Sequence, residues 1–119
     1  MEKRKSVLSE KSYDFAIRIV KLSQTLNTQK EFVLSKQILK SGTSVGALIR
    51  EAKFAQSNAD FIHKFSIVLK EAHETEYWLN LLKDTSYIEE NIFEEINKTC
   101  SEIIAMLIAT INTLKSKNS

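Results

Sequence analysis

Apolar residues recur at alternating steps of three and four along most of the chain, which is the spacing of one face of an α-helix. The most regular run leads from Phe61 to Leu82, and a second leads from Phe93 to Leu114. Shorter runs lie before residue 27 and between residues 34 and 52. The pattern predicts four helices, over residues 9–26, 31–55, 58–83 and 89–115.

The three connections between these segments are short and polar. Because short connections join antiparallel neighbours, they predict an up-down-up-down four-helix bundle. The composition points the same way, since 119 residues include no proline and only two glycines. The chain is therefore expected to be all-α and to form a single domain over residues 1–119.

Both glycines, Gly42 and Gly46, lie inside the second predicted helix. Each costs about 1 kcal/mol of helix stability relative to alanine, and a spacing of four places both on one face. We therefore expect another helix to pack closely against them. A phosphate-binding loop is disfavoured, because no strand precedes the segment and no lysine follows at the required spacing.

The first and fourth helices carry more apolar residues than one seam requires. In an isolated bundle this surplus would face water, so it predicts a homo-oligomer. The residues expected at its interface lie off the main seams: Ile17, Val20, Ile104, Ile108 and Ile111.

The net charge of +2 conceals an asymmetry. Residues 1–70 carry 13 Lys and Arg against six Asp and Glu, whereas residues 71–119 carry four against nine. The second and third helices could present a basic strip suited to phosphates, formed by Lys36, Lys40, Arg50, Lys53 and Lys64. The alternative is an ordinary solvated face on antiparallel helices of complementary charge.

The sequence contains no recognised catalytic or metal-binding pattern. A di-iron bundle needs Glu-x-x-His motifs on two helices, but both histidines, His63 and His73, lie on one helix and neither follows such a motif. Cys100 lies on an apolar seam and is expected in the core. We therefore expect no enzyme, no metal and no cofactor. With one cysteine and no apolar run near the 20 residues of a membrane span, a cytoplasmic location is expected.

Two segments resemble a known family. They are Gln37–Ala52, which contains Ser-Gly-Thr-Ser, and Leu69–Leu79, which contains Glu-Thr-Glu-Tyr-Trp-Leu. Similar segments occur in bacterial four-helix-bundle proteins first noted as reading frames within intervening sequences of large-subunit ribosomal RNA genes. The resemblance implies a small bundle that assembles as a ring, commonly a pentamer. A relative of similar fold, the accessory protein of diversity-generating retroelements, binds a reverse transcriptase and nucleic acid through a basic surface.

The resemblance also bears on single positions. Glu51, Glu74 and Glu76 match acidic positions of the family, and we expect them to form interhelical hydrogen bonds or ion pairs, with ligand contact as the alternative. Leu48 stands where the family usually has asparagine. The expected function is a non-enzymatic, self-assembling scaffold for RNA or an RNA-associated protein. A purely structural homo-oligomer and, less favoured, a metal-binding or enzymatic bundle are the alternatives.

Overall fold

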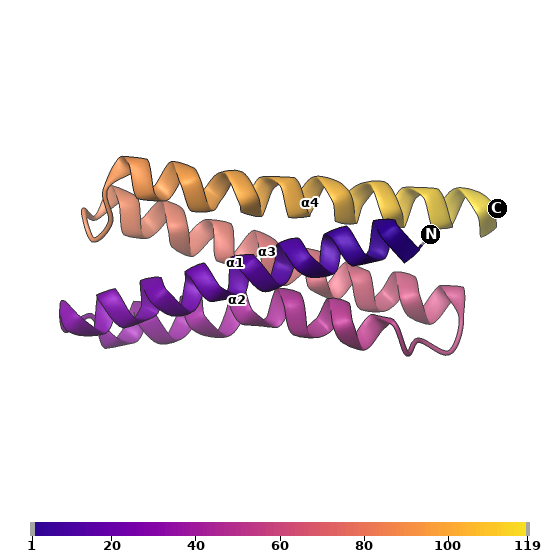
Figure 1. Cartoon of the computed structure of the whole chain (residues 1–119), viewed down its shortest axis with the longest axis horizontal. Helices are drawn as coiled ribbons and strands as arrows, with labels where there is room; N and C mark the ends of the chain where they lie inside the picture. The colour runs from indigo at the N-terminus through magenta and orange to yellow at the C-terminus, as the bar shows by residue number, and fades with distance from the viewer. Residues whose placement is uncertain (1, 119) are drawn as a thin grey trace.

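The computed structural model describes residues 2–118, and the side chains of residues 7–117. Its helices are α1 (Glu2–Thr28), α2 (Phe32–Ala52), α3 (Asn58–Asp84) and α4 (Glu90–Asn118), with no strand among the described residues. Each packs on the next, and α1 also contacts α4, which closes a four-cornered bundle measuring 48 × 22 × 22 Å (Figure 1). The predicted all-α, antiparallel four-helix bundle is confirmed.

The core follows the predicted seams. Every helix contributes side chains that are completely enclosed, among them Phe15 and Ile19 of α1, Ile38 and Val45 of α2, Val68 and Leu79 of α3, and Ile103 and Leu107 of α4. Burying such side chains stabilises the bundle by about 1.5–3 kcal/mol each. The bundle therefore has one continuous core along its length.

Buried hydroxyl groups join α2 to both of its neighbours. The Ser23 and Ser35 hydroxyls lie 2.6 Å apart between α1 and α2. On the other side of α2, the Thr75 hydroxyl of α3 lies 2.9 Å from the Ser41 hydroxyl. Because a buried hydroxyl without a partner costs about 1–3 kcal/mol, these pairs favour one register of α2 against α1 and α3.

Three helix boundaries differ from the prediction by three residues or more, and one of them is the end of the fourth helix, which reaches Asn118 rather than residue 115. The first helix begins at Glu2 rather than residue 9, since no proline or glycine interrupts it and Leu8 packs into the core. The second helix ends at Ala52 rather than residue 55. Beyond it, the amides of Lys53, Phe54 and Ala55 each donate to the carbonyl three residues earlier, which tightens the chain into a turn.

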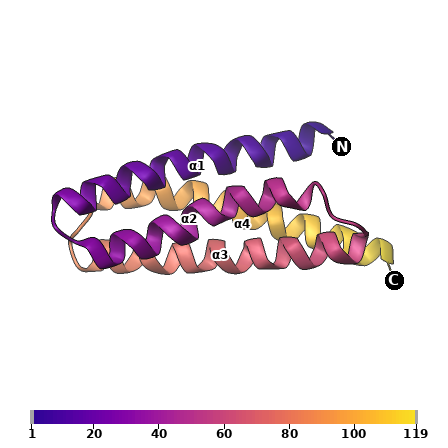
Figure 2. The same cartoon turned by 90° about the horizontal axis from the view of Figure 1, so that it is seen from below.

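The ends of α1 and α3 share one capping arrangement. Lys30 and Ser86 have positive φ angles of 64° and 66°, although neither is glycine. After each, an amide donates five residues back, from Glu31 to Leu26 and from Tyr87 to Leu82. This is the Schellman motif, which reverses the chain at one end of the bundle. The α2–α3 connection and both termini lie at the other end (Figures 1 and 2).

Candidate nucleic-acid interface

The close packing of α2 on α1 determines which face of α2 is left exposed to solvent. A Cβ atom added at Gly42 would lie 2.7 Å from Cγ2 of Ile19, and one added at Gly46 would lie 3.3 Å from the backbone oxygen of Ser12. The structure thus places both glycines against α1. With α3 on its other flank, α2 leaves one remaining face to solvent.

That solvent face carries most of the expected basic strip. Lys36, Lys40 and Arg50 are exposed, and none of them has an ion pair among the described residues. Lys36 and Arg50 are fourteen positions apart, which corresponds to about 21 Å along a helix. The strip is therefore long enough to contact several successive phosphates of a nucleic acid.

The remaining two residues of the strip lie at the α2–α3 connection and differ from each other. Lys53 is the exposed C-cap of α2 and has no ion pair among the described residues. Lys64 lies 3.4 Å from Asp60, one turn earlier on α3. A cation held by its own helix neighbour has less charge to offer a ligand, so Lys64 is the weakest member of the strip.

The α2–α3 connection itself is held by hydrogen bonds at both ends. Ser57 caps α3 by accepting from the Asp60 amide, and the Asp60 carboxylate accepts from the Gln56 amide at 3.0 Å. The Gln56 hydrogen bond, followed by that from Lys64, lowers the pKa of Asp60. In this ordered connection the Phe54 side chain is 80% exposed. The sequence prediction placed Phe54 within a helix and so gave no sign of this exposure.

Among the described residues, the three acidic positions do not form the expected interhelical hydrogen bonds or ion pairs. The Glu74 carboxylate accepts from the indole N–H of Trp78 at 3.3 Å, and Glu76 lies 3.6 Å from Nδ1 of His73. Both partners are on α3 itself, and Glu51 is exposed on α2. The expectation is wrong for Glu74 and Glu76 because residues three or four apart on one helix are closer neighbours than residues across an exposed groove.

Leu48 is partly buried and packs against the core. An apolar side chain therefore suits this position of α2, where an asparagine would bring two polar atoms to the edge of the core.

The expected oligomer interface divides into two groups. Ile17, Val20 and Ile108 keep 41%, 37% and 40% of their surface exposed. Ile104 and Ile111 are 8% and 6% exposed and belong to the core, so their assignment to surplus surface is wrong. They are buried because the core-facing stripe of a helix is wider than a single line of residues.

Tyr13 adds to the exposed apolar side of α1. Its side chain is 60% exposed. Tyr13, Ile17 and Val20 are spaced by four and three residues, so they lie on one face of α1. We call Tyr13, Ile17 and Val20 the α1 stripe.

The one cysteine of the chain, Cys100, is buried. Burial, and to a smaller extent Glu76, raises the pKa of the Cys100 thiol to about 12, and the thiol donates to the Ala72 carbonyl at 3.5 Å. A thiol of this kind is protonated at neutral pH and is no nucleophile. Within the described residues, no three His, Cys, Asp or Glu side chains are placed to hold a metal ion.

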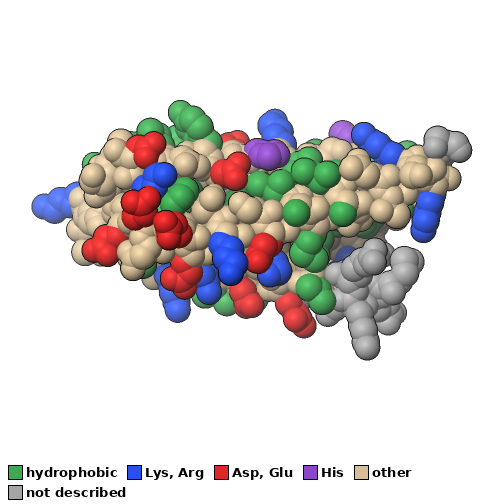
Figure 3. Space-filling model, turned by 90° about the horizontal axis from the view of Figure 1, so that it is seen from above, with side chains coloured by type: hydrophobic (Ala, Val, Ile, Leu, Met, Phe, Trp, Pro, Cys, Tyr) green, Lys and Arg blue, Asp and Glu red, His purple; other side chains and the backbone are tan. Residues whose placement is uncertain are grey.

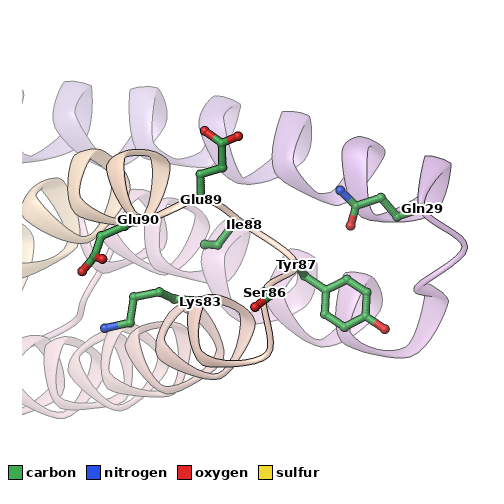
Figure 4. A pocket seen from close by; sticks show the side chains of 7 residues that line it. All are labelled: Gln29, Lys83, Ser86, Tyr87, Ile88, Glu89 and Glu90. Carbon is green, nitrogen blue, oxygen red and sulfur yellow. The ribbon is translucent and has the colours of Figure 1, made fainter.

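A shallow hollow opens at the end of the bundle that carries the two Schellman motifs. It is lined by Gln29, Lys83, Ser86, Tyr87, Ile88, Glu89 and Glu90. Figure 4 shows Glu89 and Tyr87 pointing in opposite directions. The Lys83 ammonium lies 4.3 Å from the centre of the Phe93 ring, and Asp84 is 3.8 Å away. Lys83 is thus already engaged by contacts within the chain.

The two ends of the bundle differ in charge. Figure 3 shows acidic side chains gathered toward the end where α4 begins, and Glu89, Glu90, Glu94 and Glu95 are all exposed there. At the opposite end, exposed cations lie in the last turns of α2 and α4 or directly after α2: Arg50, Lys53, Lys115 and Lys117. We call these four residues the basic end. The basic end is therefore a favourable place for an anionic polymer to bind.

The comparisons with known proteins agree with this architecture. A crystal structure of a protein of unknown function from the S23 ribosomal protein family of Bacteroides thetaiotaomicron VPI-5482 superposes with a TM-score of 0.89. The two chains are 57% identical, and the match covers 92% of this chain and 98% of that one. A search of curated proteins gives no significant match.

The family of 23S rRNA-intervening sequence proteins matches residues 4–109. Neither this description nor that of the solved structure names an enzymatic activity. None of the helices within the described residues is both long and apolar enough to cross a membrane. By fold and by sequence, the chain belongs to the family of 23S rRNA-intervening sequence proteins.

Proposed function

We propose that the protein is a non-enzymatic, self-assembling helical bundle that acts as a cytoplasmic binding scaffold for RNA. The observation that carries the proposal is the row of exposed cations on the outer face of α2, Lys36, Lys40 and Arg50, continued by Lys53 at its end. Membership of a family named for ribosomal RNA intervening sequences supports RNA as the partner. An RNA-associated protein, such as a reverse transcriptase, is a second partner that the basic surface could bind.

Assembly would strengthen such binding without new contacts. In a closed ring, which we propose to contain five protomers, each protomer repeats the same cationic row. Several rows then engage one RNA strand at a high effective concentration. The exposed α1 stripe supports assembly, because its side chains keep 37–60% of their surface exposed. Burying that remainder would gain roughly half of the about 1.5–3 kcal/mol expected for a fully exposed side chain.

The test is a titration of the protein with single-stranded RNA over a range of salt concentrations. Each phosphate neutralised adds about 0.7 to the slope of log affinity against log salt. Replacing Lys36, Lys40, Arg50 and Lys53 together by glutamine should flatten this slope while the circular dichroism spectrum stays helical. A matched control replaces four exposed cations outside the row that have no ion pair among the described residues, Lys21, Lys30, Lys70 and Lys98, in the same way and should change the slope less.

A purely structural homo-oligomer is the second candidate, and the α1 stripe is the observation that favours it. The two functions separate in one experiment. A wild-type protein that assembles but binds no RNA at about 50 mM salt, where electrostatic binding is strong, is structural and refutes the RNA scaffold.

A further inference from the structure

We infer that the nucleic acid bound by this protein is single-stranded, and that Phe54 provides a platform on which one of its bases stacks beside the basic end. This inference rests on the proposed function and specifies both the form of the RNA and the place where a base is held. It starts from one apolar side chain. Phe54 is 80% exposed, which is the highest exposure among the large hydrophobic residues of the described chain.

The exposure of Phe54 is built into the backbone. The amides of residues 53, 54 and 55 donate to the carbonyls of Arg50, Glu51 and Ala52, and the next amide, of Gln56, donates to the Asp60 carboxylate. Every amide from residue 53 to residue 56 therefore has a partner within the chain. A connection held in this way cannot readily fold over to cover the phenyl ring, so the ring remains available to a ligand.

The surroundings of Phe54 select the ligand. Arg50 precedes it by four residues and Lys53 by one, both exposed and without an ion pair among the described residues. Glu51 is the one exposed carboxylate in the same turn, since Asp60 is engaged by Gln56 and Lys64. Lys115 and Lys117 close α4 at the same end of the bundle (Figures 1 and 2). The neighbourhood is net positive and suits a polyanion.

An aromatic ring among cations is the combination by which proteins hold single strands. Phosphates are neutralised by the cations, and an unpaired base stacks on the ring. In a duplex the bases are already stacked on each other and are not available to Phe54. The geometry therefore favours a single strand, or an unpaired loop, over a double helix, with little preference for base identity.

The same helix offers a matched control. Phe32 is 57% exposed at the first position of α2, whereas Phe54 follows the last position, so the two rings lie at opposite ends of this helix. Phe32 follows Glu31, whose carboxylate caps α2, and Lys36 is the one cation of the row within a turn of it. Phe32→Leu and Phe54→Leu each remove one exposed ring while keeping an apolar side chain.

The experiment measures binding of the full chain to a mixed-sequence RNA strand and to the duplex formed with its complement. Phe54→Leu should weaken binding of the single strand by about 5- to 150-fold, which is the loss expected for one stacking platform. Its salt slope should equal that of the wild type, because no charge is removed. Duplex affinity should not change, Phe32→Leu should weaken single-strand binding less than Phe54→Leu does, and Phe54→Trp should restore single-strand binding.

Three results would overturn the inference. If wild type binds neither RNA, the proposed function fails and the inference fails with it. If wild type binds the single strand and Phe54→Leu binds it equally well, only the inference fails. If Phe54→Leu instead alters the mass measured by light scattering and Phe54→Trp does not restore RNA binding, the ring serves contacts between protein chains.

Discussion

At the scale of single residues, the glycines are explained by space rather than by backbone conformation. Neither glycine of the chain has a positive φ angle, whereas Lys30 and Ser86 do. Gly42 faces the completely buried Ile19, so an added methyl group would meet a side chain that has no room to move.

We expect Gly42→Ala to lower the free energy of unfolding by about 1 kcal/mol. The overpacking cost of about 1–3 kcal/mol exceeds the gain of about 1 kcal/mol in helix propensity. Urea unfolding would measure the change. In an Ile19→Ala background the clash is removed, so the same substitution should stabilise the protein. A loss of stability that persists in that background would contradict the explanation.

The buried Cys100 thiol should make the stability of the protein depend on pH. Burial raises the pKa of its thiol from 9.0 to about 12, so between these values the folded chain keeps a proton that the unfolded chain releases. Stability therefore falls as the pH rises from about 9 to about 12. Urea unfolding of wild type and Cys100→Ala across this range would isolate the effect, since the variant lacks this contribution. Identical pH profiles for the two proteins would show that the thiol is not protected.

At the scale of helices, the sequence predicted the seams and missed several ends. The seams are predictable because a spacing of three and four is a property of the α-helix itself. The end of α2 was missed because residues 53–55 contain no proline or glycine, and the turn depends on hydrogen bonds to Arg50, Glu51 and Ala52. Consequently the exposure of Phe54, which is central to the candidate site, was not predictable from the sequence.

The turns that end α1 and α3 contain no glycine, so the positions of the two glycines did not predict these turns. Schellman motifs usually place glycine where this chain has Lys30 and Ser86. The left-handed conformation costs an L-residue about 1–2 kcal/mol. A glycine would remove this cost, but part of the gain would be lost because glycine gives the unfolded chain more conformational freedom.

We expect Ser86→Gly to raise the free energy of unfolding by about 0.5–1 kcal/mol, and Lys30→Gly to act similarly. Thermal unfolding followed by circular dichroism would detect the gain. Thr85→Gly is the control, because Thr85 has a φ of −100° and its hydroxyl donates to the Leu81 carbonyl. That variant should be destabilised. Destabilisation of Ser86→Gly as well would mean that the positive φ angle carries no strain.

At the scale of the whole molecule, contacts within one chain leave part of each helix uncovered. The bundle is narrow, so each helix has two neighbours and a face directed to solvent. Sequence periodicity cannot decide how wide the buried stripe is, and this is why Ile104 and Ile111 were assigned to the surface. Ile17 and Val20 remain outside because they lie on the α1 stripe, away from both α2 and α4. The α1 stripe is therefore the part of the interface prediction that a mutation can test.

We expect Ile17→Lys to convert an assembled protein into single chains of 13.6 kDa. A lysine in a buried contact between protomers must lose its hydration or prevent the contact. Ile67 of α3 is the matched control, since it is 38% exposed where Ile17 is 41% exposed. Light scattering at micromolar concentration should give a multiple of 13.6 kDa for wild type and Ile67→Lys, and the single mass for Ile17→Lys. Because both substitutions lie outside the core, the helical circular dichroism signal should be unchanged in each.

A wild-type mass of 13.6 kDa would refute self-assembly, and assembly that survives Ile17→Lys would place the contact on another face.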